Sequence, residues 1–271
     1  MITVSFVNQK SKVGKTTLVV NLAAAIDKIC RGSRCRQLIV DVDPQARATD
    51  IMLDPLDMNK PNISHLFDNE TYDKFGLIYK TRFDSIDIIP SSIELSMKEF
   101  YCANILNWHL RLKDYLQKVE DNYDLCFIDC PSALSPLVLS ALTASDYVFI
   151  PASPSRYSVL GIEDLFQSIS FFKELNPEIK ILGIVPSIVD KRYKMHNDIL
   201  VELKKNFSEF FLDDLTISTN ATLKSATTLK KTLFEHKYDP KAYKSIMKLA
   251  KWILGVTDVY QKGLAVLNNE E

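Results

Sequence analysis

The chain has almost no net charge and no long apolar run, and each absence excludes a class of protein. Its 33 Lys and Arg residues are matched by 34 Asp and Glu residues, which leaves a formal charge of −1. No global field therefore drives the chain onto nucleic acid or membrane, and any such binding must come from a local patch. No segment approaches the roughly 18 consecutive apolar residues of a membrane span. We expect no membrane-spanning segment.

Paired cysteines are also absent. The five cysteines, at Cys30, Cys35, Cys102, Cys126 and Cys130, form no CxxC pair, and the last two lie in an apolar, strand-like run. This pattern favours buried, reduced thiols over a metal site or a disulfide framework. The opening residues MITVSFVNQK lack the charged start and cleavage pattern of a signal peptide. We therefore expect a cytoplasmic protein.

Short apolar runs rich in β-branched residues alternate with segments of helical period. We expect buried strands at 2–7, 37–42, 86–89, 125–128, 147–150 and 179–185, and helices at 16–29, 105–119, 159–175 and 196–206. This alternation predicts an α/β fold with a doubly wound, mostly parallel sheet and helices on both faces. The length of 271 residues and the 46% hydrophobic content predict one domain over residues 1–260, followed by a short polar tail at 261–271.

A phosphate-binding loop is predicted directly after the first strand. The segment from Gln9 to Thr17 reads QKSKVGKTT and leads straight into a helix. Backbone N–H groups at a helix N-terminus can cradle phosphate oxygens, a Lys can reach the β and γ phosphates, and a Thr hydroxyl can ligate Mg²⁺. Gly14, Lys15 and Thr16 match these roles. The strict pattern requires Gly where Gln9 stands, so the GKT tripeptide alone fits a chance helix start equally well.

The longer string NQKSKVGKTT, Asn8 to Thr17, resembles the deviant Walker A motif of the ParA/MinD family, in which NQKGGVGKTT is typical. The resemblance implies a P-loop NTPase fold that binds ATP and Mg²⁺. It also implies that Lys10, the signature lysine, reaches across an ATP-bound homodimer and, with Lys15, stabilises charge on the transferring phosphoryl group. The nucleotide contacts that it implies are Lys12, Val13, Gly14, Lys15, Thr16 and Thr17.

Two acidic segments are similar to further motifs of the same family. The string LIVDVDPQARAT resembles the element DxDPQxxxT, which implies that Asp43 positions or activates the attacking water and that Asp41 lies close to the metal. The string YDLCFIDCPSAL resembles the Walker B segment YDxxxIDxPP, which implies that Asp129 and Thr16 hold Mg²⁺. Taken alone, an Asp after a strand is more often an N-cap or turn residue.

The resemblance covers roughly residues 1–255 and is strongest to ParA-type DNA-partition ATPases. Its later part includes Ser140 to Leu165, which looks like the helix and strand that follow the Walker B segment. The string GIVPSIVDKR, Gly183 to Arg192, resembles the strand and turn that approach the adenine. This likeness makes Asp190 a candidate contact to the base.

Two loop positions depart from the family pattern, because Ser11 and Lys12 stand where the family has glycines. Glycine accepts a positive φ and leaves room for close approach of the backbone to a ligand. If either position needs a left-handed conformation, we expect a penalty of about 1–2 kcal/mol. The Lys12 side chain could obstruct a dimer, turn to solvent or supply another cation for the phosphates. An active ATPase and an impaired or regulatory nucleotide binder both remain open.

A basic C-terminal segment makes DNA a candidate ligand. The family's DNA-contacting arginines are replaced here by Thr219 and Thr222, but nine lysines and three acidic residues lie between Leu215 and Lys262. On a helix beginning near Pro240, four lysines share one face and apolar residues share the other. The predicted phosphate contacts are Lys224, Lys230, Lys241, Lys244, Lys248 and Lys251. The alternative is a solvated lysine face on a helix that is docked on the core.

Two functions follow from these patterns. The first is a partition ATPase that forms a homodimer with ATP, coats nonspecific DNA on the nucleoid and hydrolyses ATP when a ParB-like centromere-binding protein stimulates it. The second is a weakly hydrolysing, nucleotide-switched scaffold that positions a protein cargo. We expect no membrane binding, because the tail at 261–271 ends acidic. A metal–sulfur reductase is disfavoured because no cysteines are paired.

Overall fold

The sheet of this protein is almost entirely parallel. The computed structural model describes residues 1–30, 35–53, 61–67, 76–102 and 106–259. Within these ranges, seven strands form one sheet in the order β3-β4-β2-β5-β1-β6-β7, and only β3 runs antiparallel to its neighbour. The strands are β1 (Ile2–Phe6), β2 (Gln37–Asp41), β3 (Tyr79–Lys80), β4 (Ile86–Ile89), β5 (Leu125–Asp129), β6 (Tyr147–Ala152) and β7 (Lys180–Pro186).

All six predicted strands are confirmed, with ends that differ by one or two residues at most. Strand β3 was not predicted, because its two residues are too few to show a period. Strands β2 and β5 are buried at every position. Burial on both faces explains why these runs are continuously apolar and do not alternate with polar residues.

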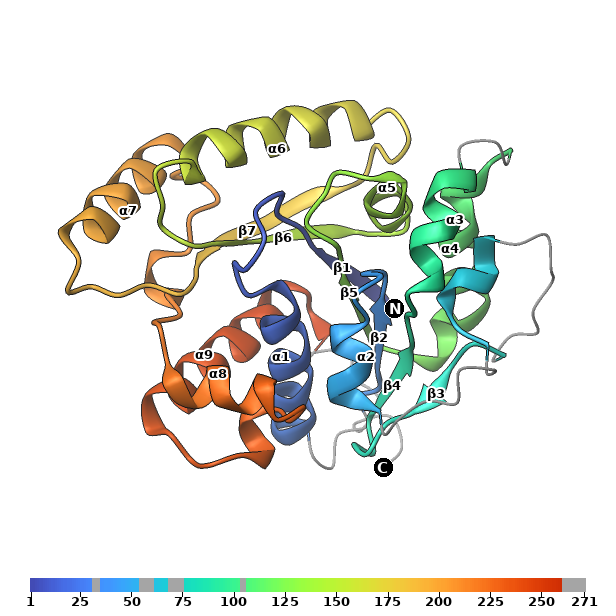
Figure 1. The fold of residues 1–271 in the computed structure, drawn as a ribbon, viewed down its shortest axis with the longest axis horizontal. Helices are drawn as coiled ribbons and strands as arrows, with labels where there is room; N and C mark the ends of the chain where they lie inside the picture. Colours follow the sequence, from blue (N-terminus) through green and yellow to red (C-terminus); the bar gives the residue numbers. More distant parts are fainter. Residues whose placement is uncertain (31–34, 54–60, 68–75, 103–105, 260–271) are drawn as a thin grey trace.

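Helices cover both faces of the sheet (Figure 1). One core contains side chains of α1 (Lys15–Ile29), α2 (Arg47–Met52), α8 (Ala221–Thr228) and α9 (Pro240–Val256). The other contains side chains of five further helices: α3 (Glu94–Cys102), α4 (Arg111–Val119), α5 (Pro136–Thr143), α6 (Ser158–Phe172) and α7 (Lys194–Asn206). Strand residues alternate between the two cores, since Ile39 belongs to the first and Leu38 and Val40 to the second. The doubly wound prediction is therefore confirmed.

One predicted helix begins too early. The prediction placed a helix over 105–119, but residues 103–105 lie outside the described ranges and α4 begins at Arg111 after the short 3₁₀ helix η2 (Trp108–Leu110). Helices α2 and α3 (Glu94–Cys102) were not predicted. The remaining 3₁₀ helices are η1 (Ile63–Phe67), η3 (Glu120–Asn122), η4 (Asp213–Leu215) and η5 (Leu233–Glu235). The predicted tail at 261–271 lies outside the described residues.

The predicted two-faced helix near Pro240 is confirmed as α9. Asp239 caps its N-terminus by accepting hydrogen bonds from the backbone N–H groups of Lys241 and Ala242, each at 3.0 Å. The apolar face packs on α1, and its members Ile246, Leu249, Ala250, Ile253 and Leu254 are buried. The four predicted lysines, Lys241, Lys244, Lys248 and Lys251, are exposed on the other face.

The cysteine prediction is confirmed at four positions. Cys30, Cys35, Cys126 and Cys130 are buried free thiols, and the side chain of Cys102 lies outside what the structure describes. In the described ranges, no cluster of three or more His, Cys, Asp or Glu side chains is arranged to hold a metal ion. Across the same part of the chain, every helix is too short or too polar to cross a bilayer.

The docking of α9 on α1 can be tested by truncating its apolar face. We expect Ile253→Ala to lower the free energy of unfolding by about 2–5 kcal/mol, because the fully buried side chain leaves a cavity. The matched control is Lys251→Ala on the exposed face, which should change stability by less than about 0.5 kcal/mol. Urea-induced unfolding measures both values. Equal effects would contradict the orientation of the helix.

Candidate functional site

The predicted site residues gather where β1, β2 and β5 end. Strand β5 lies between β1 and β2, and the register places Asp129 beside both Phe6 and Asp41. The carboxyl ends of parallel strands form one edge of a sheet, and ligands of open α/β proteins bind outside that edge. The register therefore makes neighbours of Asp41 and Asp129 at this edge, although they are far apart in the sequence.

The loop between β1 and α1 is fixed by hydrogen bonds to β6 and to the residue that follows β7. The Asn8 amide donates to Pro151 O of β6 at 2.7 Å, and Asn8 Oδ1 accepts from the backbone N–H of Lys10 at 2.8 Å. On the other side of the loop, the Ser187 hydroxyl donates to Val13 O at 2.7 Å. These contacts hold the backbone of the predicted phosphate loop. Sequence analysis did not identify Ser187, because no local pattern marks a residue that acts from 174 positions away.

Two loop residues have a left-handed backbone. Gly14, the N-cap of α1, has φ 93°, and Lys12 has φ 59°. Ser11 is absent from the positive-φ residues of the described chain. Of the two glycine replacements, only Lys12 therefore occupies the conformation that favours glycine, and it carries a strain of about 1–2 kcal/mol. The strain that the sequence predicted for a left-handed Ser11 or Lys12 is therefore present at Lys12 and not at Ser11.

Lys15 is buried at the start of α1. Its ammonium donates to Asn8 O at 2.9 Å and to Ser132 Oγ at 3.0 Å. Burial lowers the pKa of Lys15, and the negative charge of Asp129 opposes that effect. Ser132 follows β5, so the loop after that strand helps to position the lysine. The predicted phosphate lysine and the predicted metal carboxylate therefore lie in one electrostatic group.

The two buried carboxylates differ in their hydrogen bonding. Asp41 Oδ2 accepts from the backbone N–H and the hydroxyl of Thr49, at 2.9 and 2.8 Å, and Asp41 Oδ1 accepts from the N–H of Asp43 at 3.1 Å. Burial raises the pKa of Asp41 to about 7, although the hydrogen bonds from Thr49 oppose the rise. Asp41 thus uses both oxygens to hold the segment that carries Asp43.

Asp129 is fully buried, and neither of its carboxylate oxygens has a hydrogen-bond partner among the described residues. Burial and then the charge of Asp41 raise the pKa of Asp129 well above its usual value, and neighbouring Thr16 and Lys15 oppose the rise. A buried, unpaired carboxylate is costly unless a cation compensates it. Oxygen ligands suit Mg²⁺, which keeps several waters and needs only one or two carboxylates. Asp129 and Thr16 therefore fit a magnesium site.

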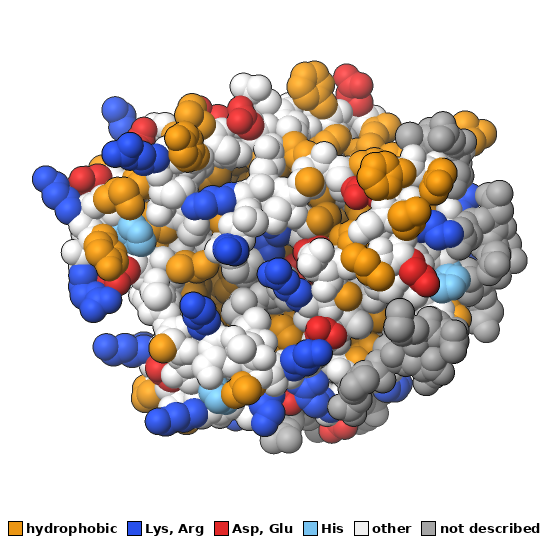
Figure 2. Space-filling model, in the orientation of Figure 1, with side chains coloured by type: hydrophobic (Ala, Val, Ile, Leu, Met, Phe, Trp, Pro, Cys, Tyr) orange, Lys and Arg blue, Asp and Glu red, His pale blue; other side chains and the backbone are white. Residues whose placement is uncertain are grey.

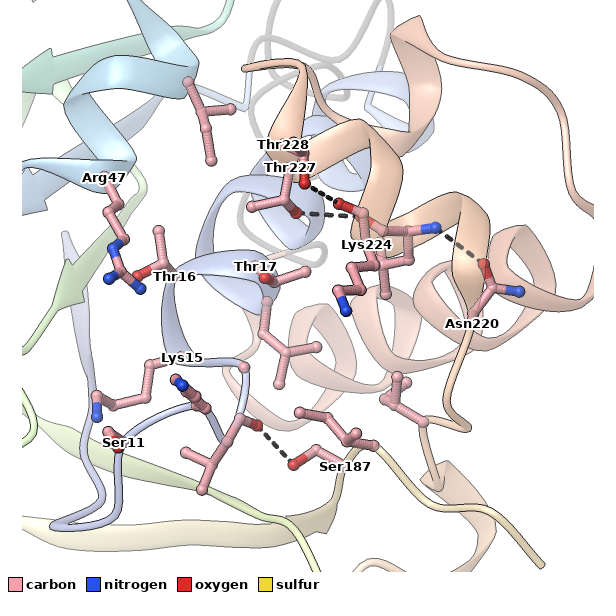
Figure 3. A pocket seen from close by; sticks show the side chains of 18 of the residues that line it. Ser11, Lys15, Thr16, Thr17, Arg47, Ser187, Asn220, Lys224, Thr227 and Thr228 are labelled. Carbon is pink, nitrogen blue, oxygen red and sulfur yellow. Dashed lines mark hydrogen bonds between the residues drawn. The ribbon is translucent and has the colours of Figure 1, made fainter.

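A cavity of about 950 Å³ opens beside these groups. Figure 3 shows Lys15, Thr16 and Thr17 at the start of α1, with Ser187 and Lys224 across the cavity and Arg47 at another side. The lining includes five cationic side chains, Lys12, Lys15, Arg47, Lys224 and Lys230, and two carboxylates, Asp43 and Asp50. Figure 2 shows Lys and Arg side chains gathered around the hollow in this face. The cavity therefore suits an anionic ligand.

The far wall of the cavity is less polar, and the sequence predicted only part of it. The resemblance placed residues 183–192 near the adenine through Asp190, but it gave no role to Ile188. The far wall includes Ile188, Ile217 and Leu223. Ile188 has φ 55°, which is strained for a β-branched residue, and its side chain is 39% exposed. The segment 217–219 pairs with Val189 through two backbone hydrogen bonds, from Val189 N to Ile217 O and from Thr219 N to Val189 O. Sequence analysis considered this segment only for arginines that contact DNA.

Several predicted residues lie outside the cavity lining. Lys10 is on the loop, but its ammonium contacts Ser153 and Ser155 of the segment after β6. Asp190 accepts hydrogen bonds from Arg192 at 2.6 and 2.9 Å, and this contact lowers the pKa of Asp190 to about 2. Its role as a base contact stays a prediction. Lys224 and Lys230, predicted to bind DNA, line the cavity, and Lys230 forms an ion pair with Asp50 at 3.1 Å.

Comparison with known proteins agrees with this geometry. The family model of the AAA domain matches residues 1–181. The chain is 33% identical over 241 residues to the sporulation initiation inhibitor protein Soj of Bacillus subtilis, and the match covers 88% of this chain and 92% of Soj.

Solved structures share the fold over nearly the whole chain. A putative plasmid partition protein from Borrelia burgdorferi, bound to AMPPNP, is 25% identical with a TM-score of 0.75, and the match covers 96% of this chain and 98% of that one. Cobyrinic acid a,c-diamide synthase from Mycobacterium smegmatis, with a bound ATP analog and magnesium, is 24% identical with a TM-score of 0.79, and 94% of each chain is covered.

The strain at Lys12 can be measured by returning glycine to the loop. We expect Lys12→Gly to raise the free energy of unfolding by about 0.5–1 kcal/mol, since relief of the left-handed strain exceeds the greater flexibility of glycine in the unfolded chain. Ser11→Gly is the matched control and should leave stability unchanged or lower it by up to about 1 kcal/mol. Urea-induced unfolding compares the two variants. A larger gain from Ser11→Gly would contradict the assignment of strain to Lys12.

Proposed function

The chain belongs to the ParA/MinD family of P-loop ATPases, and we propose that it is a DNA-partition ATPase that binds ATP with Mg²⁺ and hydrolyses it slowly. In this proposal ATP closes a homodimer, the dimer binds nonspecific DNA on the nucleoid, and a ParB-like centromere-binding protein stimulates hydrolysis. The observation that carries the proposal is the buried Asp129 carboxylate, which has no hydrogen-bond partner among the described residues and lies beside Thr16 and Lys15. Both of these neighbours line the cationic cavity.

The residues divide the work of phosphoryl transfer. The backbone N–H groups from Val13 to Thr17 surround the β-phosphate, as the free N–H groups of a helix N-terminus do for anions. The Lys15 ammonium exchanges its contacts with Asn8 O and Ser132 Oγ for phosphate oxygens, because charge-assisted hydrogen bonds are stronger than neutral ones. Asp129 and Thr16 would hold Mg²⁺, which supplies positive charge to the β and γ phosphates.

Asp43 is the residue that we propose to orient the attacking water. It is partly exposed on the cavity wall, and its Oδ1 accepts the backbone N–H of Gln45 at 2.9 Å. The segment that carries it is held by the hydrogen bonds of Asp41 to Thr49. The Asp43 carboxylate is therefore held at the edge of the cavity, where it would accept a hydrogen bond from the attacking water.

The base would be read by backbone groups of the far wall. Val189 donates to Ile217 O and accepts from Thr219 N, so the N–H and C=O of Ser218 point to the other side of this parallel bridge. Ser218 lines the cavity. One donor beside one acceptor matches N1 and the 6-amino group of adenine and mismatches guanine, while Ile188 and Leu223 offer apolar contact to the ring. This arrangement supports Ser218 as a base contact in addition to the predicted Asp190.

DNA binding would use the lysines of α9 together with Lys224 and Lys230. Among the described residues, no carboxylate lies within ion-pair distance of Lys241, Lys244 or Lys251. Lys248 donates to Asp214 O at 2.7 Å and is less free. A row of uncompensated cations on a rigid helix can contact successive backbone phosphates without reading sequence.

The second candidate function is a nucleotide-switched scaffold that positions a protein cargo and hydrolyses little ATP. The observation that favours it is Lys12, a charged residue in a strained conformation beside the cavity. Its side chain adds a cation near the phosphates but also enlarges the surface that a second copy would have to approach. The rate of ATP hydrolysis distinguishes this function from the ATPase.

Nucleotide binding and hydrolysis can be separated with two variants. We expect Lys15→Ala to weaken Mg-ATP binding by about 30-fold or more, since it removes a buried cation from the phosphate site. We expect Asp43→Ala to keep the affinity and to lower turnover by roughly 10²–10⁴-fold. Calorimetry and phosphate release measure the two effects, with Lys118→Ala on α4 as the control. Calorimetry should also show ATP bound more tightly than GTP.

Two outcomes would contradict this proposal. Equal affinity for Mg-ATP in the parent chain and Lys15→Ala would place the nucleotide elsewhere. Hydrolysis that stays at background in the presence of DNA and a cell extract, with normal ATP binding, would favour the scaffold function over the ATPase.

The DNA proposal predicts a salt-dependent effect of α9. We expect the triple change of Lys241, Lys244 and Lys251 to Ala to weaken binding to DNA of unrelated sequences equally, and to reduce the slope of log affinity against log salt by about one for each lysine. The control is the triple change of Lys118, Lys173 and Lys205 to Ala, which removes the same charge from other exposed surfaces. Filter retention with Mg-ATP measures both. Equal losses of affinity in the two triple variants would show that only the total charge matters, and would contradict a specific role of α9.

A further inference from the structure

Lys10 is held away from the nucleotide cavity. It belongs to the phosphate loop, yet it is not among the residues that line the cavity. Its ammonium donates to Ser153 Oγ at 2.9 Å and to Ser155 Oγ at 2.7 Å. Both serines lie in the segment between β6 and α6. The Lys10 ammonium is therefore engaged by hydroxyl groups of its own chain, apart from the cavity that its loop helps to form.

The two serines are held in place by further hydrogen bonds, so that both hydroxyls face the Lys10 ammonium. The Ser158 hydroxyl donates to Ser153 O, accepts from the backbone N–H of Ser155 at 3.0 Å and lies 2.9 Å from Ser155 Oγ. The backbone of Lys10 is attached to the same strand end, because its N–H bonds to Asn8 and the Asn8 amide bonds to Pro151. Both ends of the lysine are thus fixed to the carboxyl end of β6.

The contact is made only by neutral groups. Within the described part of the chain, no carboxylate lies within ion-pair distance of Lys10. Burial lowers the pKa of the Lys10 ammonium, as expected for a cation without a counter-ion. Hydroxyl groups hold an ammonium less strongly than a phosphate does. The contact is therefore strong enough to set a resting position and weak enough to yield to a phosphate.

We propose that Ser153 and Ser155 are positioning residues that hold Lys10 in its own subunit and thereby set how readily two nucleotide-bound copies associate. This rests on the proposed function, in which Lys10 contacts the phosphates bound by the partner subunit. The free energy that holds Lys10 on the serines is lost when it turns to the partner. Association is therefore weaker than it would be in a chain that lacks the two hydroxyls.

The contact itself can be observed without nucleotide. Lysine ammonium protons that are held in hydrogen bonds exchange slowly and give resolved ¹H–¹⁵N signals. We expect one such signal to disappear in Lys10→Gln, which assigns it, and to disappear in the double variant Ser153→Ala, Ser155→Ala. Ser155→Thr, which keeps the hydroxyl, should retain it, as should the control Ser168→Ala, whose hydroxyl contacts only Asp164 O of its own helix.

The consequence can be measured by sedimentation with Mg²⁺ and the non-hydrolysable analogue AMPPNP. We expect the dimer dissociation constant to fall about tenfold or more in the double serine variant, because each of the two subunits loses two hydrogen bonds to a charged group. It should stay at the parent value in Ser168→Ala and Ser155→Thr. Unchanged or weaker association of the double variant would overturn the proposal, as would an ammonium signal that survives the loss of both serines.

Failure of the proposed function has a different signature. Suppose that calorimetry shows AMPPNP binding and that the Lys10 ammonium signal is lost when both serines are replaced. If no variant then associates at any concentration tested, the homodimer of the proposed function is refuted. The same result overturns the role of the serines in association, while the hydrogen bonds from Lys10 are upheld by the loss of the signal.

Discussion

The site depends on one carboxylate that the fold buries without a partner. Asp129 ends β5, the strand between β1 and β2, and the parallel register brings it beside Asp41 and next to the loop that begins α1. A buried charge of this kind is unfavourable until a cation compensates it. Lys15 supplies part of that compensation, and the carboxylate of Asp129 and the hydroxyl of Thr16 are oxygen ligands of the kind that Mg²⁺ prefers. The proposed binding of Mg-ATP at this edge of the sheet rests on this unmet electrostatic demand.

The phosphate loop tolerates a residue that its conformation disfavours, because neighbouring elements fix it. Asn8 ties the loop to β6, Ser187 ties it to β7, and Lys15 bonds back to its start. A strained backbone persists only where the surrounding structure over-determines it. Lys12 can therefore stand in the left-handed region at a modest loss of stability. This conformation is compatible with both the ATPase and the scaffold function. The strain leaves the loop intact, whereas the Lys12 side chain changes the surface that a second copy of the chain would meet.

The positive charge of the chain is divided between two places, although the total charge is −1. One set of cations surrounds the nucleotide cavity and includes Lys224 and Lys230. The other lies on the outer face of α9, which docks its apolar face on α1. Because α1 begins at the phosphate loop and carries α9 on its side, the nucleotide site and the lysine face share one rigid element. The link gives a physical route by which nucleotide binding in the cavity would influence the surface that we propose to contact DNA.

Six of the seven strands in the described residues, the phosphate loop and the two carboxylates could be predicted from the amino-acid pattern. Buried parallel strands are continuous apolar runs, and phosphate loops need Gly, Lys and Thr in immediate succession, so both signals are local. The lysine face of α9 was predictable for the same reason, because helical period is a local property. No local pattern indicated four features of the site: Ser218 at the far wall, the hydrogen bond from Ser187 to the loop, the position of the Lys10 ammonium, and the position of Lys224 and Lys230 at the cavity. These features depend on segments that the crossovers of the sheet bring together, and no spacing along the chain records such an encounter.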